Sequence, residues 1–327
     1  MKTTLLAAGL VTLAVPVMAE TPVLTVLTYD SFVSEWGPGP LIKAGFEAEC
    51  GCELRLVAAG DGAALLARVR LEGEASETDV VVGLDTTLTA SAAATGLFAP
   101  VTGQAHDLPV AYADPLFLPF DWGWFAMVYD STRLTTPPES FEALGASDLK
   151  ILIQDPRSST PGLGLVMWVK AAYGDRADEI WAALADNIVT VTPGWSEAYS
   201  LFLEGEADMV LSYTTSPAYH LIAEGDATKA AAPFAEGHYL QIEVAGKLAA
   251  TDQPALADAF LAYLGSEAAQ EALITTNWMY PARLPAAGLP AGFETLIQPA
   301  TSLLFPAAEA EALRGPATLE WQEALTR

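Results

Sequence analysis

Aromatic, acidic and hydroxyl side chains recur in this sequence directly after stretches that read as β-strands. Tyr29 follows the first such stretch, Asp61 and Gly62 follow the second, and Tyr213 ends a later one. Aromatic faces attract cations, carboxylates neutralise positive charge, and hydroxyls hydrogen-bond to the edge of a heteroaromatic ring. The pattern therefore predicts a binding site for a flat, polar, cationic ligand.

Three aromatic residues stand out because their neighbours are Gly, Ser, Thr or Asn, as in loops. They are Trp195, Tyr213 and Trp278. Burial in the core is the main alternative for any single Trp or Tyr. The loop-like surroundings favour a place on the wall of a binding site for these three.

The segment Ser158–Gly162 reads Ser-Ser-Thr-Pro-Gly and predicts the start of a helix. Thr160 suits the N-cap, and Pro161 suits the first helical position. The first N–H groups of a helix have no partner within it. Together with the hydroxyls of Ser159 and Thr160 they could hold an anion such as a phosphate. A plain capped helix explains the same residues, so both interpretations stay open.

Signs of catalysis or metal binding are weak. The sequence has no GxGxxG, GxxxxGK[ST] or GxSxG motif. Its histidines, His106, His220 and His238, show neither metal-ligand spacing nor a nucleophilic partner, and we expect the last two to be structural or to line a cleft. We therefore expect a binding protein without catalytic residues, cofactor or metal site.

The cysteines Cys50 and Cys52 are separated by one residue. In an oxidising compartment they could form a disulfide, but so short a loop is strained, and free thiols remain an equal alternative. Two cysteines without a nearby histidine make a poor metal site.

Charge and the N-terminus restrict the class of protein. The net charge of -26, from 15 basic and 41 acidic residues, argues against nucleic-acid binding. Lys2, the apolar run Leu5–Val17 and the small residues before Glu20 predict a signal peptide over residues 1–19, cleaved after Ala19. The apolar run is too short to span a bilayer, which needs roughly 20 residues. We therefore expect a periplasmic protein.

Strand-like and helical stretches alternate along the mature chain, which predicts an α/β fold. Predicted strands are Val23–Thr28, Glu53–Val57, Asp79–Leu84, Trp124–Tyr129, Ile151–Ile153, Met209–Tyr213 and Tyr239–Val244. Predicted helices include one capped by Asp61, Pro161–Tyr173, Arg176–Asp186, Ala198–Leu203 and most of the chain from Pro254.

The pattern restarts after Pro119, which indicates two lobes. We assign residues 20–119 and 238–327 to lobe 1 and residues 120–237 to lobe 2. Ligands of open α/β sheets bind beyond the carboxyl ends of the strands. The predicted site is therefore the cleft between the lobes, which would close on the ligand by a hinge motion.

Several segments together resemble the periplasmic thiamine-binding proteins of bacterial ABC importers, over nearly the whole mature chain. These segments are Leu27–Phe32, Trp36–Pro40, Cys50–Leu54, Gln154–Arg157, Ser159–Gly164, Gly194–Tyr199, Leu211–His220, Glu236–Gln241 and Asn277–Pro281. The chain departs from the family pattern around Gln104–Leu116 and just before Asp61, so the resemblance supports lobe 1 contacts less than lobe 2 contacts.

The resemblance implies a two-lobe periplasmic binding protein fold, type II-like, of the iron- and thiamine-binding branch. The implied ligand is thiamine, with its monophosphate and diphosphate, and the implied partner is an ABC transporter permease with its ATPase. The implied state is a monomer. The implied contacts are Asp61, Gly62, Ser159, Thr160, Trp195, Tyr213, Thr214, Thr215 and Ser216, with Tyr29 and Trp278 as aromatic walls.

Roles follow from combining the resemblance with the chemistry of these residues. The helix start at Ser159 and Thr160 would hold a phosphate or hydroxyethyl end. Aromatic rings would cover the thiazolium and pyrimidine rings, and Asp61 would meet the positive charge.

Two other classes of function stay open. The same fold could bind a polyamine, a sulfonate or ferric iron, although Tyr213 and Tyr219 are not adjacent, as iron ligands would be. An enzyme of thiamine or pyrimidine metabolism would need a cysteine in the cleft. Cys50 and Cys52 instead precede a predicted strand, at the opposite end from the site.

Overall fold

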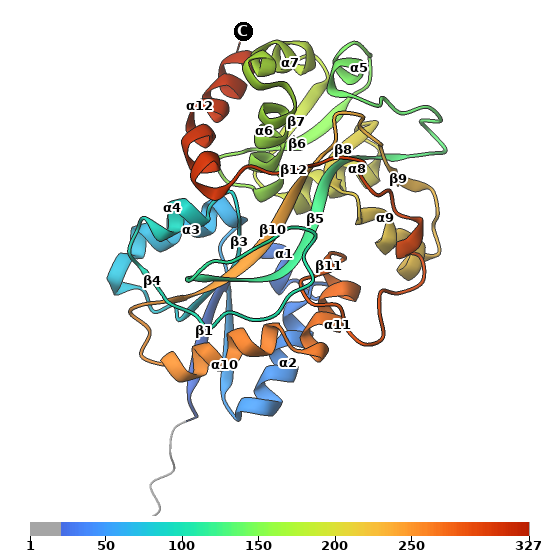
Figure 1. The fold of residues 1–327 in the computed structure, drawn as a ribbon. Helices are drawn as coiled ribbons and strands as arrows, with labels where there is room; N and C mark the ends of the chain where they lie inside the picture. The colour runs from blue at the N-terminus through green and yellow to red at the C-terminus, as the bar shows by residue number, and fades with distance from the viewer. Residues whose placement is uncertain (1–20, 327) are drawn as a thin grey trace, which may run out of the picture.

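The computed structural model describes residues 21–326. The predicted signal peptide, residues 1–19, and its cleavage after Ala19 lie outside the described residues. Within the described range, no helix is both long and apolar enough to cross a membrane. The chain forms a mixed α/β structure of two lobes, one below and one above the middle of Figure 1.

Three parallel strands begin the first lobe. β1 (Val23–Thr28) lies between β2 (Glu53–Ala58) and β3 (Val80–Asp85). The three predicted strands are confirmed to within one residue. Every residue of β3 is buried, because β-branched side chains such as those of its valines fill a parallel sheet that is covered on both faces. The helices α2 (Gly39–Cys50) and α3 (Gly62–Glu72) connect these strands.

Two long antiparallel strands join the lobes. β10 (His238–Leu248) pairs with β3 and with β5 (Phe117–Asp130). Residues of β5 up to Trp124 pair with β10, and those from Phe125 onward pair with the second lobe. Both strands are longer than predicted, and Figure 1 shows them running between the lobes.

The second lobe extends the sheet through three more strands. β8 (Met209–Tyr213) pairs with β5, β6 (Ile151–Gln154) pairs parallel with β8, and β7 (Ile188–Thr192) forms the edge. The main strand order is β2-β1-β3-β10-β5-β8-β6-β7.

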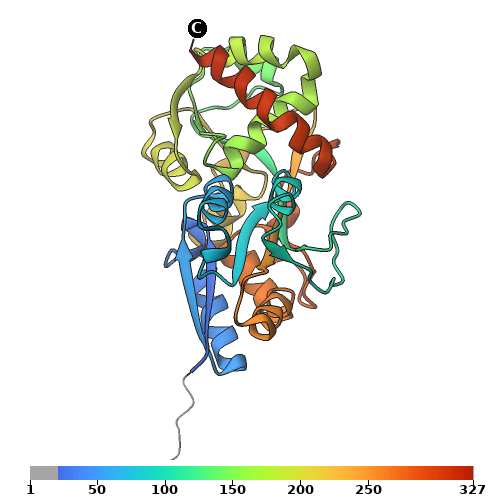
Figure 2. The same cartoon turned by 90° about the vertical axis from the view of Figure 1, so that its left-hand side faces the viewer.

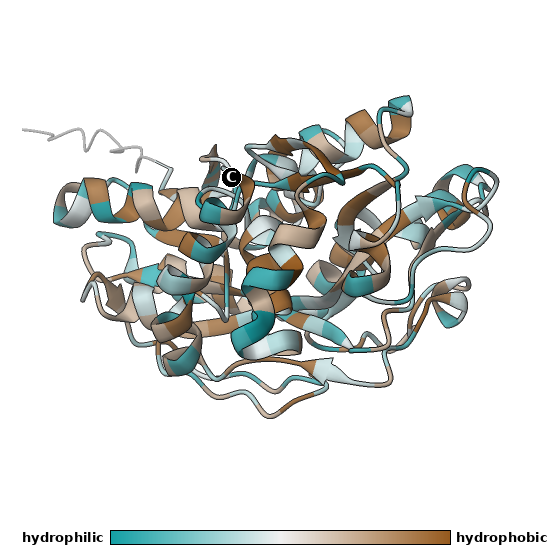
Figure 3. Ribbon diagram, turned by 90° about the horizontal axis from the view of Figure 1, so that it is seen from above, coloured by the Kyte–Doolittle hydropathy of each residue, from teal (hydrophilic) through white to brown (hydrophobic). Residues whose placement is uncertain are grey.

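Helices cover the sheet. In the second lobe these are α6 (Thr160–Tyr173), α7 (Ala177–Leu184) and α8 (Trp195–Glu204). Figure 3 shows hydrophobic and hydrophilic residues in alternating bands along the helices. The inward bands supply core side chains such as Trp168 and Trp181, both of which are fully buried.

The C-terminal segment visits both lobes. α10 (Pro254–Leu264) and α11 (Glu267–Thr276) pack against α2 in the first lobe. α12 (Ala307–Leu325) packs against α6 and α7, as Figure 2 shows, with Lys170 Nζ 2.9 Å from Glu320 Oε1. The assignment of residues 238–327 to lobe 1 stays a prediction, and α12 lies against the helices of lobe 2.

Short elements complete the described fold. They are α1 (Asp30–Val33), α4 (Thr89–Ala93), α5 (Phe141–Gly145), α9 (Ser216–Tyr219), β4 (Phe98–Ala99), β9 (Lys229–Ala231), β11 (Tyr280–Pro281), β12 (Ser302–Leu303), a π-helical turn His220–Glu224 and 3₁₀ turns at Gly73–Ala75, Gly174–Arg176 and Phe293–Thr295.

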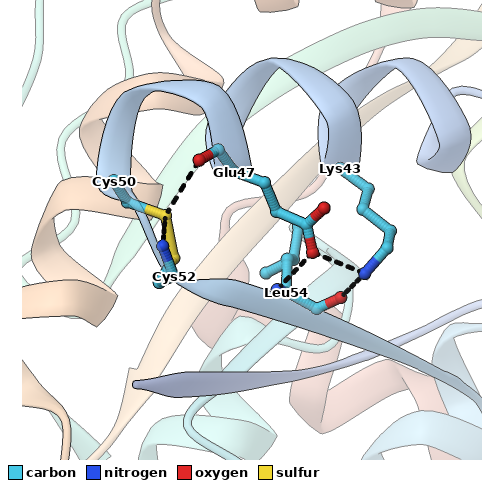
Figure 4. Close-up of a disulfide and its surroundings, with 5 residues drawn as sticks. All are labelled: Lys43, Glu47, Cys50, Cys52 and Leu54. Atoms are coloured by element: carbon cyan, nitrogen blue, oxygen red, sulfur yellow. Dashed lines mark hydrogen bonds and ion pairs between the residues drawn. A yellow bond between two sulfur atoms is a disulfide. The ribbon is translucent and has the colours of Figure 1, made fainter. Parts of the chain in front are cut away.

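Cys50 and Cys52 form a disulfide, which decides between the two alternatives left open by the sequence. The bond joins the end of α2 to the segment that enters β2 (Figure 4). The carboxylate of Glu47 accepts hydrogen bonds from Leu54 N at 2.8 Å and from Lys43 Nζ at 2.6 Å. This junction lies at the amino end of β2, while Asp61 follows its carboxyl end.

Candidate functional site

A cavity of about 280 Å³ opens beyond the strand ends. Tyr29 and Asp61 contribute to it from the first lobe, and Trp195 and Tyr213 from the second. The aromatic residues on its wall are Tyr29, Trp36, Trp195, Tyr199, Tyr213, Tyr219 and Trp278. Rings from both lobes therefore enclose the same space.

Most of the residues predicted for the site lie on this wall. They are Tyr29, Asp61, Thr160, Trp195, Tyr213, Thr215, Ser216 and Trp278. Gly62, Ser159 and Thr214 do not line the cavity, but Gly62 and Ser159 hydrogen-bond to Thr160 and Asp61, which do. Their roles in binding stay predictions, but the fold brings the whole predicted set together.

Trp278 has an unusual backbone conformation. Its φ of 55° lies in the left-handed region, which is strained for a large side chain. Its ring packs edge-on against Tyr219, with the ring centroids 5.6 Å apart. Strained residues gather at functional sites, so this conformation favours a role for Trp278 in the cavity.

The indole of Trp195 is held on several sides. Its Nε1 donates to Ser212 Oγ at 2.8 Å, and its ring stacks on Tyr199 with the centroids 5.0 Å apart. Trp36 from the first lobe lies 6.2 Å away, centroid to centroid. Trp195 therefore presents a fixed aromatic face where the two lobes approach each other.

Asp61 links the lobes directly. Its Oδ2 accepts hydrogen bonds from Ser159 Oγ at 2.8 Å and from Trp195 N at 3.3 Å. Burial raises the pKa of Asp61 to about 6, and these two hydrogen bonds lower it only in part. Asp61 occupies the N-cap position of α3 without capping that helix, because its side chain reaches across the cleft instead.

The start of α6 differs from the prediction by one residue. Ser159, not Thr160, occupies the N-cap position, so the predicted N-cap was wrong. Thr160 Oγ1 instead accepts a hydrogen bond from Gly62 N at 3.0 Å, across the cleft. The hydroxyls predicted to hold an anion therefore contact the first lobe in this structure.

Gly62 permits this approach. A Cβ atom at this position would lie 2.5 Å from Thr160 Oγ1 and 2.9 Å from Gly83 O. Real Cβ atoms essentially never lie within 3.0 Å of another heavy atom, so a side chain here would force Thr160 or Gly83 to shift and would disturb this contact between the lobes.

The turn after β8 supplies both wall and support. Tyr213 and Ser216 face the cavity, and Ser216 Oγ accepts a hydrogen bond from Tyr213 N at 3.1 Å. Thr214 is fully buried, and its N–H donates to Trp124 O at 2.9 Å. Thr214 therefore holds the turn in place and does not face the cavity.

Sequence reasoning missed several polar residues on the wall, among them Glu243 and Asn277. Glu243 Oε2 accepts from Tyr29 OH at 3.0 Å, and Asn277 Nδ2 donates to the same hydroxyl at 3.0 Å. The signal for Glu243 was a single carboxylate between Ile242 and Val244 in an apolar strand. Such a residue has no simple role in a core.

Trp36, Tyr199 and Tyr219 were also missed as wall residues. All three belong to segments that carry the family resemblance, so their types gave a signal. Across residues 21–326, no group of three or more His, Cys, Asp or Glu residues is arranged to hold a metal ion.

Comparison with known proteins decides the family. The model of the family described as bacterial extracellular solute-binding protein matches residues 37–271. The chain belongs to this family.

Relatives of this solute-binding protein span almost its full length. It is 54% identical to the thiamine-binding periplasmic protein of Escherichia coli, over 95% of this chain and 96% of that protein. It is 48% identical to the protein of that name from Brucella melitensis, over 93% of this chain and 92% of that protein. The predicted resemblance is confirmed.

Solved structures agree on the fold. A structure named periplasmic thiamin binding protein is 52% identical and matches with a TM-score of 0.92, covering 96% of this chain and 99% of that one. A ferric binding protein from Campylobacter jejuni, at 16% identity, matches with a TM-score of 0.76 over 92% of this chain and 99% of that one. The second match supports the fold alone and confirms the periplasmic binding protein architecture.

Proposed function

We propose that this protein binds thiamine, and also its monophosphate and diphosphate, in the cavity between its lobes and delivers them to the permease of an ABC importer. The observation that carries this proposal is the chemistry of the wall. Aromatic rings surround the carboxylates of Asp61 and Glu243, and among the described residues lining the cavity none is Lys or Arg. A cationic, flat ligand meets favourable partners there.

Thiamine fits that chemistry. Its thiazolium ring carries a permanent positive charge, and its aminopyrimidine ring offers N–H donors and ring-nitrogen acceptors. The rings of Trp195, Tyr213, Tyr219 and Trp278 would cover the two heterocycles. Asp61 would meet the charge, and Ser159 and Thr160 would contact the hydroxyethyl or phosphate end by exchanging their present partners.

The same carboxylates and rings would suit a polyamine or another organic cation, which is the alternative ligand class. An enzymatic role has less support. The two cysteines are joined in a disulfide at the amino end of β2, away from the cavity, so neither is a nucleophile for the bound ligand.

Calorimetric titration tests the proposal. The mature protein should be unfolded and refolded first, which removes any ligand that is carried through purification. We expect one-to-one binding of thiamine with a sub-micromolar Kd, or about -8 kcal/mol or better, and no turnover of the bound ligand. Absence of heat at several temperatures would rule out thiamine, and a polyamine such as spermidine would then be titrated.

Export and assembly form part of the proposal. We expect cleavage after Ala19, a periplasmic location and a monomer. N-terminal sequencing of protein recovered from the periplasm should begin at Glu20, and light scattering should give the mass of one chain with and without thiamine.

A further inference from the structure

Three carboxylates lie side by side across three neighbouring strands below the cavity. Glu243 of β10 pairs directly with Asp85 of β3 on one side and with Asp121 of β5 on the other. Glu243 is 6% exposed, Asp85 1% and Asp121 0%, so water reaches none of them freely. We call this set the carboxylate row.

The hydrogen bonds to the carboxylate row come from neutral donors. Glu243 accepts from Tyr29 OH and, at 2.7 Å, from Gln241 Nε2. Asp121 Oδ2 accepts from Asn277 Nδ2 at 2.7 Å. Neutral donors do not cancel charge, and adjacent buried carboxylates that lack a compensating cation cannot all be ionised.

Asp121 and Glu243 are direct cross-strand neighbours, because their residues pair between β5 and β10. Two ionised carboxylates are acceptors only and repel each other, so one shared proton would turn this pair into a donor and an acceptor. Asp121 Oδ1 is buried and has no hydrogen-bond partner, so it lacks the donor that such a proton would supply. Burial also raises the pKa of Asp121 to about 7 and that of Glu243 well above its usual range, which supports retention of a proton near neutral pH.

The titratable groups facing Glu243 are all acids. They come from every neighbouring element: Tyr29 after β1, Asp85 on β3, Asp121 on β5 and Tyr213 on β8. Glu243 lines the cavity, whereas Asp85 and Asp121 lie outside its lining. A ligand cation or N–H donor that reaches the row therefore does so at Glu243.

We propose that Asp121 and Glu243 share one proton in the ligand-free protein, and that a positively charged or N–H donor group of the ligand at Glu243 displaces this proton to the solvent. The ligand then provides the positive charge or donor that the proton provided before. The carboxylate row would thereby select for ligands that place such a group at Glu243. The choice of thiamine as the probe rests on the proposed function.

Proton release can be counted by titrating thiamine at pH 7 in buffers of low and high ionisation enthalpy. The observed heat should change with buffer ionisation enthalpy, with a slope equivalent to release of about half a proton to one proton per ligand. In Glu243→Gln the slope should fall to near zero while Kd rises about 10- to 100-fold. Asp61→Asn is the matched comparison, because Asp61 is the other cavity carboxylate with a raised pKa. It should retain the slope.

The outcomes separate this inference from the proposed function. Thiamine binding without a buffer-dependent heat would overturn the proposal of a shared proton. A slope that survives in Glu243→Gln and disappears in Asp61→Asn would also overturn it. Absence of heat in every buffer would instead reject thiamine as the ligand. Infrared spectroscopy of the wild-type, ligand-free protein then still tests the row, since a protonated carboxyl group has its own carbonyl band. That band should weaken in Asp121→Asn, and its absence near neutral pH would also overturn the inference.

Discussion

His220 Nδ1 lies 2.7 Å from Glu224 Oε2, behind the aromatic wall of the cavity. A carboxylate only accepts, so Nδ1 donates its proton to Glu224. Nε2 lies 2.9 Å from Tyr199 OH, and Glu224 Oε1 accepts from Tyr219 OH at 2.9 Å. One histidine–glutamate pair thus fixes two tyrosines that line the cavity.

The first prediction tests this pair as a positioning device. In Glu224→Gln the amide cannot accept from both partners as the carboxylate does. Loss of one charge-assisted hydrogen bond is expected to weaken the binding free energy of thiamine by about 1–2 kcal/mol, which raises the Kd roughly 5- to 30-fold. The increase should lie mainly in the dissociation rate, measured by stopped-flow tryptophan fluorescence. Glu206→Gln, on an exposed residue, is the control, and equal behaviour of the two variants would contradict the assignment.

The second prediction concerns closure of the lobes at Gly62. Gly62→Ala places a methyl group 2.5 Å from Thr160 Oγ1 in the second lobe and 2.9 Å from Gly83 O in the first, so the contact between the lobes must shift. We expect the fold to be retained, the thiamine Kd to rise by about tenfold or more, and small-angle X-ray scattering to show no compaction on ligand addition. Gly315→Ala is the matched control, since nothing lies within 4 Å of its added Cβ. Normal compaction in Gly62→Ala would show that the contact is not needed for closure.

Local patterns predicted the strands and the position of the cleft well. Val23–Thr28 and Met209–Tyr213 were predicted with the bounds that β1 and β8 have. Both are short apolar runs whose ends are marked by polar residues, and that information is local. The aromatic residues near the strand ends followed from the same reasoning.

Contacts between distant segments could not be predicted in the same way. Ser159 reads as part of a helix start, yet its hydroxyl bonds to Asp61, which lies 98 positions away. Glu243 reads as a misplaced residue in a strand until the pairing of β10 with β3 and β5 places two aspartates beside it. α12 gives no local sign that it packs against α6 and α7.

The third prediction is a pH dependence of stability that comes from Asp85. Burial raises its pKa to about 7, whereas an unfolded aspartate titrates near about 3.9. At any pH between these two pKa values, Asp85 therefore carries a proton in the folded state that it has lost in the unfolded state. The contribution of this group to the free energy of unfolding is full below about pH 4 and falls as the pH rises to about 7, by up to roughly 1.4 kcal/mol per pH unit.

Asp85→Asn isolates this contribution, because the amide imitates the protonated acid and does not titrate. The free energy of unfolding of the variant minus that of the wild type should increase by roughly 2–4 kcal/mol from pH 4.5 to pH 7.5. Urea unfolding at both pH values measures this difference. Asp252→Asn, at an exposed position, should show no such trend. A constant or opposite difference for Asp85→Asn would mean that the carboxyl group is ionised in the folded protein.

The fourth prediction separates the two roles of Trp278, its ring and its backbone. Trp278→Ala and Trp278→Gly both remove the ring, so both should raise the thiamine Kd to a similar extent, about 10- to 30-fold for the loss of one cation–π wall. Their stabilities should differ, because φ at this position is 55° and glycine adopts that value without the strain that a Cβ brings. Trp278→Gly should be more stable than Trp278→Ala by about 0.5–1 kcal/mol in urea unfolding, even though glycine loses more chain entropy on folding. Equal stabilities, or a more stable alanine variant, would show that the left-handed conformation is relaxed when the ring is absent, and that the ring itself holds the backbone in its strained form.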